Sequence, residues 1–196
     1  MTTLLIVLGV VVVIGFFLVA IYNRLVSLRN QVKNAWGQID VQLQRRYDLI
    51  PNLLETVKGY MQYEKSTLEA VIQARQQAVS AREQIKNEGA PTENSMKQMV
   101  GAEAAVRSSL GNIFALAENY PQLRASENMR VLQEELSSTE NKIAFARQAY
   151  NDQVMFYNTA QQTFPAVMVA GLFGNTPSGL YEIENADARQ AVKVAF

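Results

Sequence analysis

The sequence contains neither cysteine nor histidine among its 196 residues. Without cysteine there are no disulfide bonds, thiolate zinc sites or cysteine nucleophiles. Without histidine there is no imidazole acid–base chemistry, nor the Glu-x-x-His pairs with which di-iron helical bundles bind metal. These two absences exclude the side chains on which many hydrolases and metalloenzymes depend.

An excess of charge of either sign is also missing, since 18 basic residues balance 18 acidic ones. The two signs alternate along the chain, so no basic stripe is available for phosphate groups. We therefore expect no nucleic-acid partner.

Charge is missing altogether before Arg24, and Leu4 to Ile21 is a continuous uncharged, mostly apolar run. As a helix this run would be about 27 Å long, close to the hydrocarbon thickness of a bilayer. A cleaved signal peptide is the rival interpretation, but "MTT" has no basic side chain and "FLVAIYNR" is a poor cleavage site. We predict a retained single-pass anchor over residues 1–23, with the lipid bilayer as the first partner.

Three basic residues, Arg24, Arg29 and Lys33, follow the run before the first acid, Asp40. Basic residues flanking a membrane span mark its cytoplasmic side. The predicted orientation therefore has a short N-terminus outside and the rest of the chain in the cytoplasm.

The chain after the anchor has the periodicity of helices, with apolar residues three or four positions apart and no alternating strand pattern. We predict an all-α domain, an elongated antiparallel bundle with coiled-coil packing, over residues 24–163. Its expected helices are 24–47, 51–87, 95–120 and 124–163. The last has the longest seam: Met129, Leu132, Leu136, Thr139, Ile143, Ala146, Tyr150, Gln153, Tyr157, Ala160 and Phe164. Residues 164–196 form a non-regular C-terminal tail.

The stretch "RRYDLIP", residues 45–51, places a proline within this helical pattern. Proline inside a helix costs about 3 kcal/mol, but little in the first turn. Asp48 is suited to cap a new helix, and Arg45 and Arg46 are suited to the end of the preceding one. The pattern favours a tight turn, with a kinked continuous helix as the alternative. At a turn, Arg45, Arg46, Asp48 and Pro51 would be exposed as a docking corner.

Helix lengths limit these alternatives. A straight second helix over residues 51–87 would be about 55 Å long and would carry the polar loop "NEGAPTEN" into the bilayer. Either the chain bends after the anchor, or the second helix breaks, or Pro51 only kinks the helix. "STLE" at 66–69 resembles a capping box and marks a place for such a break.

Candidate catalytic groups are few. Carboxylates gather at Glu134, Glu135 and Glu140, but solvated helix faces explain them better than a metal site. No Gly-x-Ser-x-Gly elbow or phosphate-binding glycine loop is present. We expect no enzyme activity and no cofactor or metal. Amides along the last helix (Asn128, Gln133, Asn141, Gln148, Asn151, Asn158 and Gln161) form either its polar outer face or, with Arg147, buried links.

The tail begins with the apolar segment "FPAVMVAGLFG", residues 164–174, which is too short to span a bilayer. Its contact residues are expected to be Phe164, Pro165, Leu172 and Phe173. Three arrangements remain open: packing along the bundle, lying on the membrane, or docking on a neighbouring subunit.

Three blocks, residues 22–60, 120–159 and 164–174, closely resemble the LemA family of bacterial membrane proteins. The resemblance implies a short exterior N-terminus, one transmembrane helix in the bacterial inner membrane and a cytoplasmic antiparallel helical bundle. It implies no reaction. Tyr63 stands where family members often have histidine, which argues against a metal role at that position, and Gly174-Asn175 is atypical.

We therefore expect a membrane-anchored helical scaffold or interaction protein of the bacterial envelope that acts by protein–protein contact or self-assembly. A homo-oligomer and an unidentified membrane or envelope protein are the expected partners. The alternative is a membrane-surface or membrane-remodelling protein that uses amphipathic helices and the 164–174 segment. An enzyme with an unrecognised carboxylate site is the third hypothesis.

Overall fold

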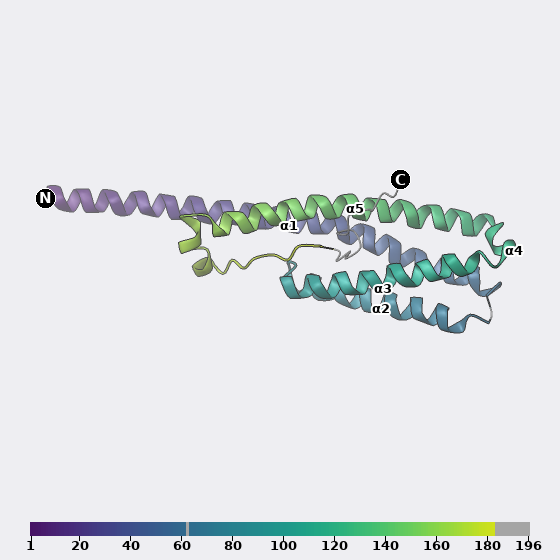
Figure 1. Ribbon diagram of the computed structural model, residues 1–196. Helices are drawn as coiled ribbons and strands as arrows, with labels where there is room; N and C mark the ends of the chain where they lie inside the picture. Colours follow the sequence, from purple (N-terminus) through teal and green to yellow (C-terminus); the bar gives the residue numbers. More distant parts are fainter. Residues whose placement is uncertain (62, 183–196) are drawn as a thin grey trace, which may run out of the picture.

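The computed structural model describes residues 1–61 and 63–182, and the regular structure in these ranges is helical (Figure 1). The predicted all-α class is confirmed, with an apolar N-terminal helical segment followed by an elongated bundle of four long helices. The elements in chain order are α1 (Thr2–Lys58), α2 (Lys65–Glu88), α3 (Glu93–Ala117), the single turn α4 (Pro121–Arg124), α5 (Glu127–Gln162), and the 3-10 turns η1 (Ala166–Met168) and η2 (Gly171–Phe173).

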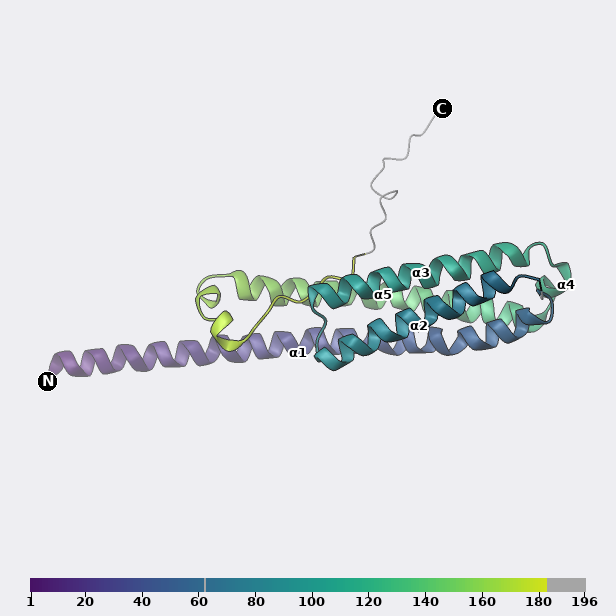
Figure 2. The ribbon, with the colours of Figure 1, turned by 90° about the horizontal axis from the view of Figure 1, so that it is seen from below.

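Helix α1 joins the apolar segment directly to the bundle. It has 57 residues and is therefore about 85 Å long. Figures 1 and 2 show its N-terminal part projecting alone beyond one end of the bundle. Its first buried residue is Leu25, and buried positions then recur down to Val57. One helix thus provides both the apolar segment and one wall of the core.

The bundle consists of two antiparallel pairs, α1 with α5 and α2 with α3 (Figures 1 and 2). Apolar side chains from all four long helices meet between the pairs in one core cluster. The predicted seams lie in this core: Val32, Ile39 and Leu43 in α1 are buried, as are Met129, Leu136, Ile143, Tyr150 and Tyr157 in α5.

Of the two alternatives at residues 48–51, the favoured tight turn is wrong and the continuous helix is found, because α1 continues through Pro51 to Lys58. The expected helices 24–47 and 51–87 are therefore divided elsewhere, at Gly59 to Glu64. Proline at position 51 cannot bond to the carbonyl of Tyr47, four residues earlier. In the structure the Arg75 side chain of α2 donates to that carbonyl over 2.8 Å and replaces the missing bond.

The break before α2 lies next to the "STLE" stretch, the place expected for it if the second helix breaks, which was one of the three alternatives. Glu64 occupies the N-cap position without a side-chain cap bond, so the expected capping box does not form. Helix α2 has 24 residues and is about 36 Å long. The loop at its end lies level with Lys33, whose Nζ is 4.0 Å from the Cβ position of Gly89. That level is about 15 Å along α1 from Asn23, so the polar loop stays clear of the apolar segment.

The remaining helices begin and end within a few residues of their predicted limits. Helix α3 begins at Glu93 rather than 95, because Thr92 and Ser95 form a reciprocal capping box. Helix α5 begins at Glu127, after α4. The described part of the tail, residues 164–182, contains η1 and η2 followed by an extended segment, whereas residues 183–196 of the predicted tail lie outside the described residues.

Candidate functional site

The "RRYD" stretch contributes to a charged cluster in the middle of the bundle. Arg46 is only 2% exposed and forms ion pairs with Glu103 of α3 and with Glu140 of α5, the latter over 2.6 Å. Tyr47 is fully buried, and its hydroxyl donates to Glu103. Arg107 of α3 also donates to Glu140, over 2.5 Å. Three helices are therefore joined through two carboxylates.

This cluster has the properties of a structural ion network. A buried charge is tolerated when it is paired and hydrogen-bonded, and here each carboxylate faces at least one guanidinium. Burial raises the pKa of Tyr47 to about 12, although Arg46 acts in the opposite direction. A phenol with such a pKa stays protonated at neutral pH. The cluster therefore fixes the relative positions of α1, α3 and α5.

The predicted docking corner has a different geometry from the one expected. Arg45, Arg46 and Asp48 lie within α1 instead of at a turn, and Arg46 is buried. Arg45 is exposed and pairs with Glu135 over 2.5 Å. Asp48 accepts a hydrogen bond from Gln44 over 2.7 Å. Nothing in these contacts tests docking itself, which stays a prediction for the exposed part of the helix.

The apolar segment Leu4 to Ile21 makes almost no contact with the bundle. Leu4 is 74% exposed and Phe16 is 75% exposed, and α1 is the one helix in the described residues that is long and apolar enough to cross a membrane. An uncharged segment of this length that no protein surface covers has its low-energy environment in a bilayer. The protein is anchored in a membrane by this segment.

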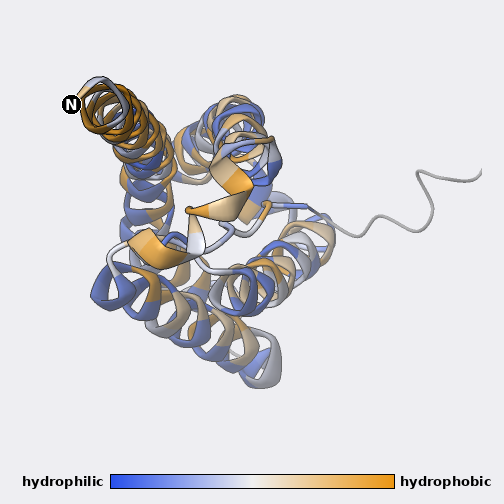
Figure 3. Cartoon of the chain, turned by 90° about the vertical axis from the view of Figure 1, so that its left-hand side faces the viewer, coloured by the Kyte–Doolittle hydropathy of each residue, from blue (hydrophilic) through white to orange (hydrophobic). Residues whose placement is uncertain are grey.

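Next to the anchor lies a compact apolar unit, residues 164–173, which we call the foot. Its Phe173 ring packs edge-to-face on Tyr22 of α1, with ring centroids 5.2 Å apart. Pro165 lines a cleft of about 270 Å³ together with Phe17 and Ile21. Figure 3 shows the foot (orange) across the end of the bundle that faces the N-terminal half of α1.

The outer side of the foot is uncovered. Phe164 is 77% exposed, Met168 is 69% exposed and Leu172 is 83% exposed. Of the four predicted tail-contact residues, Phe173 contacts Tyr22 of the anchor helix, Phe164 and Pro165 line the cleft beside that helix, and Leu172 is exposed. No charged residue occurs between Asp152 and Glu182, so the whole foot is uncharged.

Beyond the foot the chain runs back along α5 as an extended segment, residues 178–181, which we call the strap (Figures 1 and 2). The side chains of Asn151 and Asn158 hold its backbone. These two amides are half-buried and link α5 to the strap, and Gln161 is buried, whereas Asn128, Gln133, Asn141 and Gln148 are exposed on the outer face. Spacing in the sequence could suggest a pair of amides but could not identify the strap as their partner.

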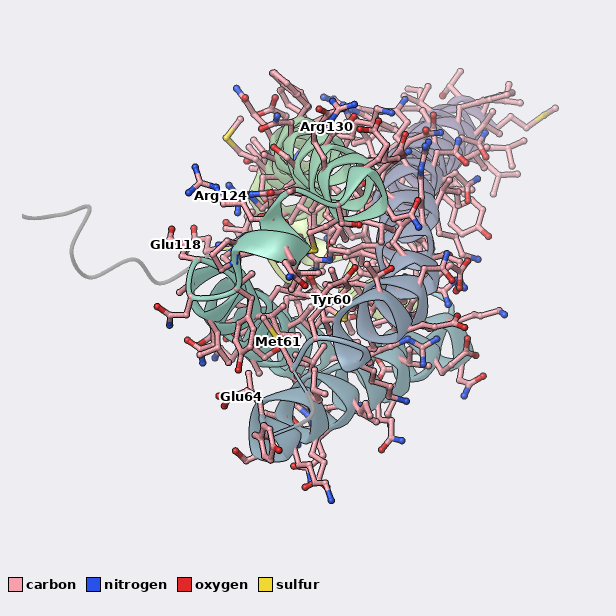
Figure 4. The ribbon with its side chains drawn as sticks, turned by 90° about the vertical axis from the view of Figure 1, so that its right-hand side faces the viewer. Tyr60, Met61, Glu64, Glu118, Arg124 and Arg130 are labelled. Carbon is pink, nitrogen blue, oxygen red and sulfur yellow. The ribbon has the colours of Figure 1, made fainter. Side chains whose placement is uncertain are left out.

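The end of the bundle far from the anchor presents charged side chains around an apolar centre. Figure 4 shows Glu118, Arg124 and Arg130 on the rim, with Met61 toward the middle. Met61 is fully buried, and Arg130 pairs with Glu127 over 2.5 Å and with Glu134 over 2.6 Å. Within the described ranges, no group of three or more acidic residues lies close enough to hold a metal ion.

The fold and these sites define a class of protein: a membrane-anchored antiparallel helical bundle with an apolar foot beside its anchor. The chain belongs to the LemA family, whose model matches residues 35–196. The resemblance inferred from the sequence blocks is thereby confirmed.

Among curated proteins the chain is similar to the magnetosome protein MamQ of Magnetospirillum gryphiswaldense. The two are 24% identical over 167 residues, which cover 78% of this chain and 61% of that relative. It is also similar to the magnetosome proteins MamQ 1 and MamQ 2 of Paramagnetospirillum magneticum. Each is 25% identical over 186 residues, covering 87% of this chain and 68% of the relative. The chain thus spans about three-fifths to two-thirds of the length of these relatives.

Proposed function

We propose that the protein is a non-catalytic, membrane-anchored scaffold of the bacterial envelope that acts by protein–protein contact and self-assembly. The observation that carries this proposal is the continuity of α1, which enters the core without a break after the anchor. A continuous helix transmits orientation, so the bundle stands on the membrane as a rigid rod. From Arg24 to Lys58 this rod is about 50 Å long.

The comparisons support a role that is not enzymatic. Family membership brings no reaction with it, and the relatives are named for the magnetosome, not for a reaction. The charged cluster in the core supports the same proposal, because its carboxylates are engaged by arginines and by Tyr47.

The outer side of α5 offers a surface for protein contact. Phe145 is 76% exposed and Phe156 is 53% exposed. The two residues are eleven positions apart, about three helical turns, so they lie on the same side of α5. Val131, 44% exposed, continues this line toward the far end. Aromatic side chains exposed in a row are typical of contact surfaces.

Self-assembly can be tested with Phe145→Glu/Phe156→Glu in the full-length protein. We expect the wild-type chain in nanodiscs or mild detergent to form an oligomer in light scattering, and the double variant to dissociate at lower concentration. Gln98→Glu/Asn112→Glu, two exposed positions on α3, adds the same charge elsewhere and is the matched control. A strictly monodisperse wild-type monomer at every concentration would contradict self-assembly.

A second candidate function is contact between the foot and the membrane surface. The specific observation is that Phe164, Met168 and Leu172 are exposed beside the residues where the anchor leaves its apolar run. Apolar side chains at this level gain free energy on entering the interface between headgroups and acyl chains. The bilayer is then a partner of the foot as well as of the anchor.

Contact of the foot with lipid can be measured by fluorescence, because the chain has a single tryptophan. In Trp36→Phe/Leu172→Trp, lipids brominated in their acyl chains should quench the new tryptophan. In Trp36→Phe/Phe145→Trp the tryptophan lies on the outer side of α5, far from the anchor, and should stay bright. Equal emission from both variants with and without bromine would refute contact of the foot with the bilayer.

A further inference from the structure

Two asparagines of α5 hold the strap by its main chain. The Asn158 side-chain amide donates to the carbonyl of Ser178 over 2.9 Å, and its oxygen accepts from the Ser178 N–H over 2.9 Å. Asn151 makes the same pair of bonds with Tyr181, over 3.2 Å and 2.8 Å. Each asparagine thus pairs with one residue as a neighbouring strand would, using one donor and one acceptor.

The spacing of the two asparagines matches an extended chain. Seven residues of helix separate them, a rise of about 10.5 Å. Three residues of extended chain separate Ser178 from Tyr181, a span of about 10 Å. The strap runs antiparallel to α5, since the later strap residue meets the earlier asparagine. The two asparagines of α5 are therefore spaced so that each can bond to the main chain of the same extended peptide.

The strap lies between α5 and the start of α3, and we call the surface that these two helices present to it the groove. The groove also limits which residue fits between the two asparagine contacts. The Tyr150 hydroxyl donates to the carbonyl of Gly179 over 2.7 Å. A Cβ at Gly179 would lie 2.6 Å from the Thr92 carbonyl oxygen and 2.9 Å from the Met96 Cβ, so glycine is required there.

The last position of the strap takes an aromatic ring. Tyr181 is 3% exposed, and the Arg147 guanidinium lies 6.0 Å from the centre of its ring. Leu180, between the glycine and the tyrosine, points outward and is 42% exposed. The groove thus holds four extended residues, of which Ser178, Gly179 and Tyr181 are buried and Leu180 is exposed.

We propose that this groove is a peptide-binding site that also accepts residues 178–181 of a second copy of the chain. This inference rests on the proposed self-assembly, and it adds a specific contact between copies, the strap of one copy in the groove of another. The four asparagine bonds go to main-chain groups, which are the same whichever copy provides them. All copies share one anchor geometry, so the grooves of neighbouring copies stand at one height above the membrane.

The chain before the strap has the reach for an exchange. Gly174 has φ +66°, a conformation that glycine adopts freely, and Thr176 and Pro177 after it are exposed. Four residues from Gly174 to Ser178 span up to about 14 Å, so the strap can enter a neighbouring groove whose first asparagine lies within this distance of Gly174. A strap placed in the next copy's groove is a head-to-tail contact, which can repeat from copy to copy along the membrane.

A photo-crosslinker at the exposed strap position tests the exchange in the full-length protein. The donor copy carries p-benzoylphenylalanine in place of Leu180 and is reconstituted in liposomes with an epitope-tagged wild-type copy. After irradiation we expect an adduct between copies that maps to α5 or to residues 91–96 of the tagged chain. A tagged Gly179→Val copy, whose own strap no longer fits its groove, should give more of this adduct.

The groove is tested separately by Asn151→Ala/Asn158→Ala in the tagged copy, which should lose the adduct. Asn128→Ala/Asn141→Ala, two exposed asparagines of α5, should keep it. Adducts confined to one chain, even with the Gly179→Val acceptor, would overturn the exchange. In that case light scattering tells whether the copies still assemble, and an oligomer held by another surface would leave the proposed function standing while the strap proposal fails.

Discussion

At the scale of single residues, the carbonyl group of Tyr47 is the group that Pro51 most affects. Proline removes the N–H that would have bonded to this carbonyl, and the side chain of Arg75 supplies a replacement donor. The substitute comes from α2, so the same bond that preserves α1 also ties the two helices together.

We predict that Arg75→Ala destabilises the bundle by about 1–3 kcal/mol, because a partly buried carbonyl loses its partner. In the Pro51→Ala background the alanine N–H can bond to Tyr47, so the same change should cost about 1 kcal/mol less. The free energies of unfolding in urea, followed by circular dichroism, give this double-mutant cycle. Equal costs in both backgrounds would show that Arg75 acts elsewhere.

The buried tyrosines predict a loss of stability at alkaline pH. Burial raises the pKa values of Tyr47 and Tyr181 to about 12 and also raises that of Tyr150. An unfolded tyrosine loses its proton near pH 10, so between about pH 10 and 12 the unfolded state binds fewer protons than the folded state. The free energy of unfolding therefore falls as pH rises through this window, by up to about 1.4 kcal/mol per pH unit for each tyrosine.

Urea unfolding measured from pH 8 to 12 checks this slope. Tyr181→Phe retains the ring under Arg147 but removes the titrating hydroxyl, so the slope above pH 10 should become shallower. Tyr63 is 96% exposed, and Tyr63→Phe is the control that should leave the slope unchanged. An identical slope in the wild type and both variants would show that Tyr181 does not contribute to the loss of stability at alkaline pH.

At the scale of elements, α5 was the most predictable part of the fold and α1 the least. The seam of α5 is long, regular and free of breakers, so local pattern and final packing agree. In α1 the sequence shows the energetic cost of Pro51, whereas the compensating Arg75 lies 28 positions after Tyr47, whose carbonyl it bonds. Periodicity reports only local relationships, so it could not place this donor, the partners of Arg46, or the strap between Asn151 and Asn158.

The cap of α3 gives a prediction at this scale. The Thr92 hydroxyl accepts from the Ser95 N–H over 3.2 Å, and the Ser95 hydroxyl accepts from the Thr92 N–H over 3.0 Å. Thr92→Ala should therefore lower the free energy of unfolding by about 1 kcal/mol. Thermal unfolding compared with Asn94→Ala, an exposed residue of the same turn, measures the effect. Equal losses in the two variants would mean that the cap contributes nothing.

At the scale of the whole molecule, the apolar surfaces lie in two separate places. The anchor and the foot are together at one end, and a line of exposed apolar residues runs along the outside of α5. This separation supports the proposed contacts of the bundle with lipid at its base and with protein along its side. The anchor could be predicted from the sequence, because a long uncharged run is a local feature that does not depend on contacts with distant segments. The foot was not, because its contact with Tyr22 joins segments far apart in the chain.

The charges at the base predict the orientation in the membrane, and this prediction can be tested directly. Arg24, Arg29 and Lys33 precede any acid on the bundle side of the anchor, which predicts that the bundle is cytoplasmic. The chain has no cysteine, so single replacements are clean reporters. In intact cells a membrane-impermeant maleimide should label Thr2→Cys, and it should label Ser138→Cys, exposed on α5, only after lysis. Labelling of Ser138→Cys in intact cells, with Thr2→Cys protected, would contradict this orientation. The groove, the strap and the outer side of α5 would then lie outside the cytoplasm.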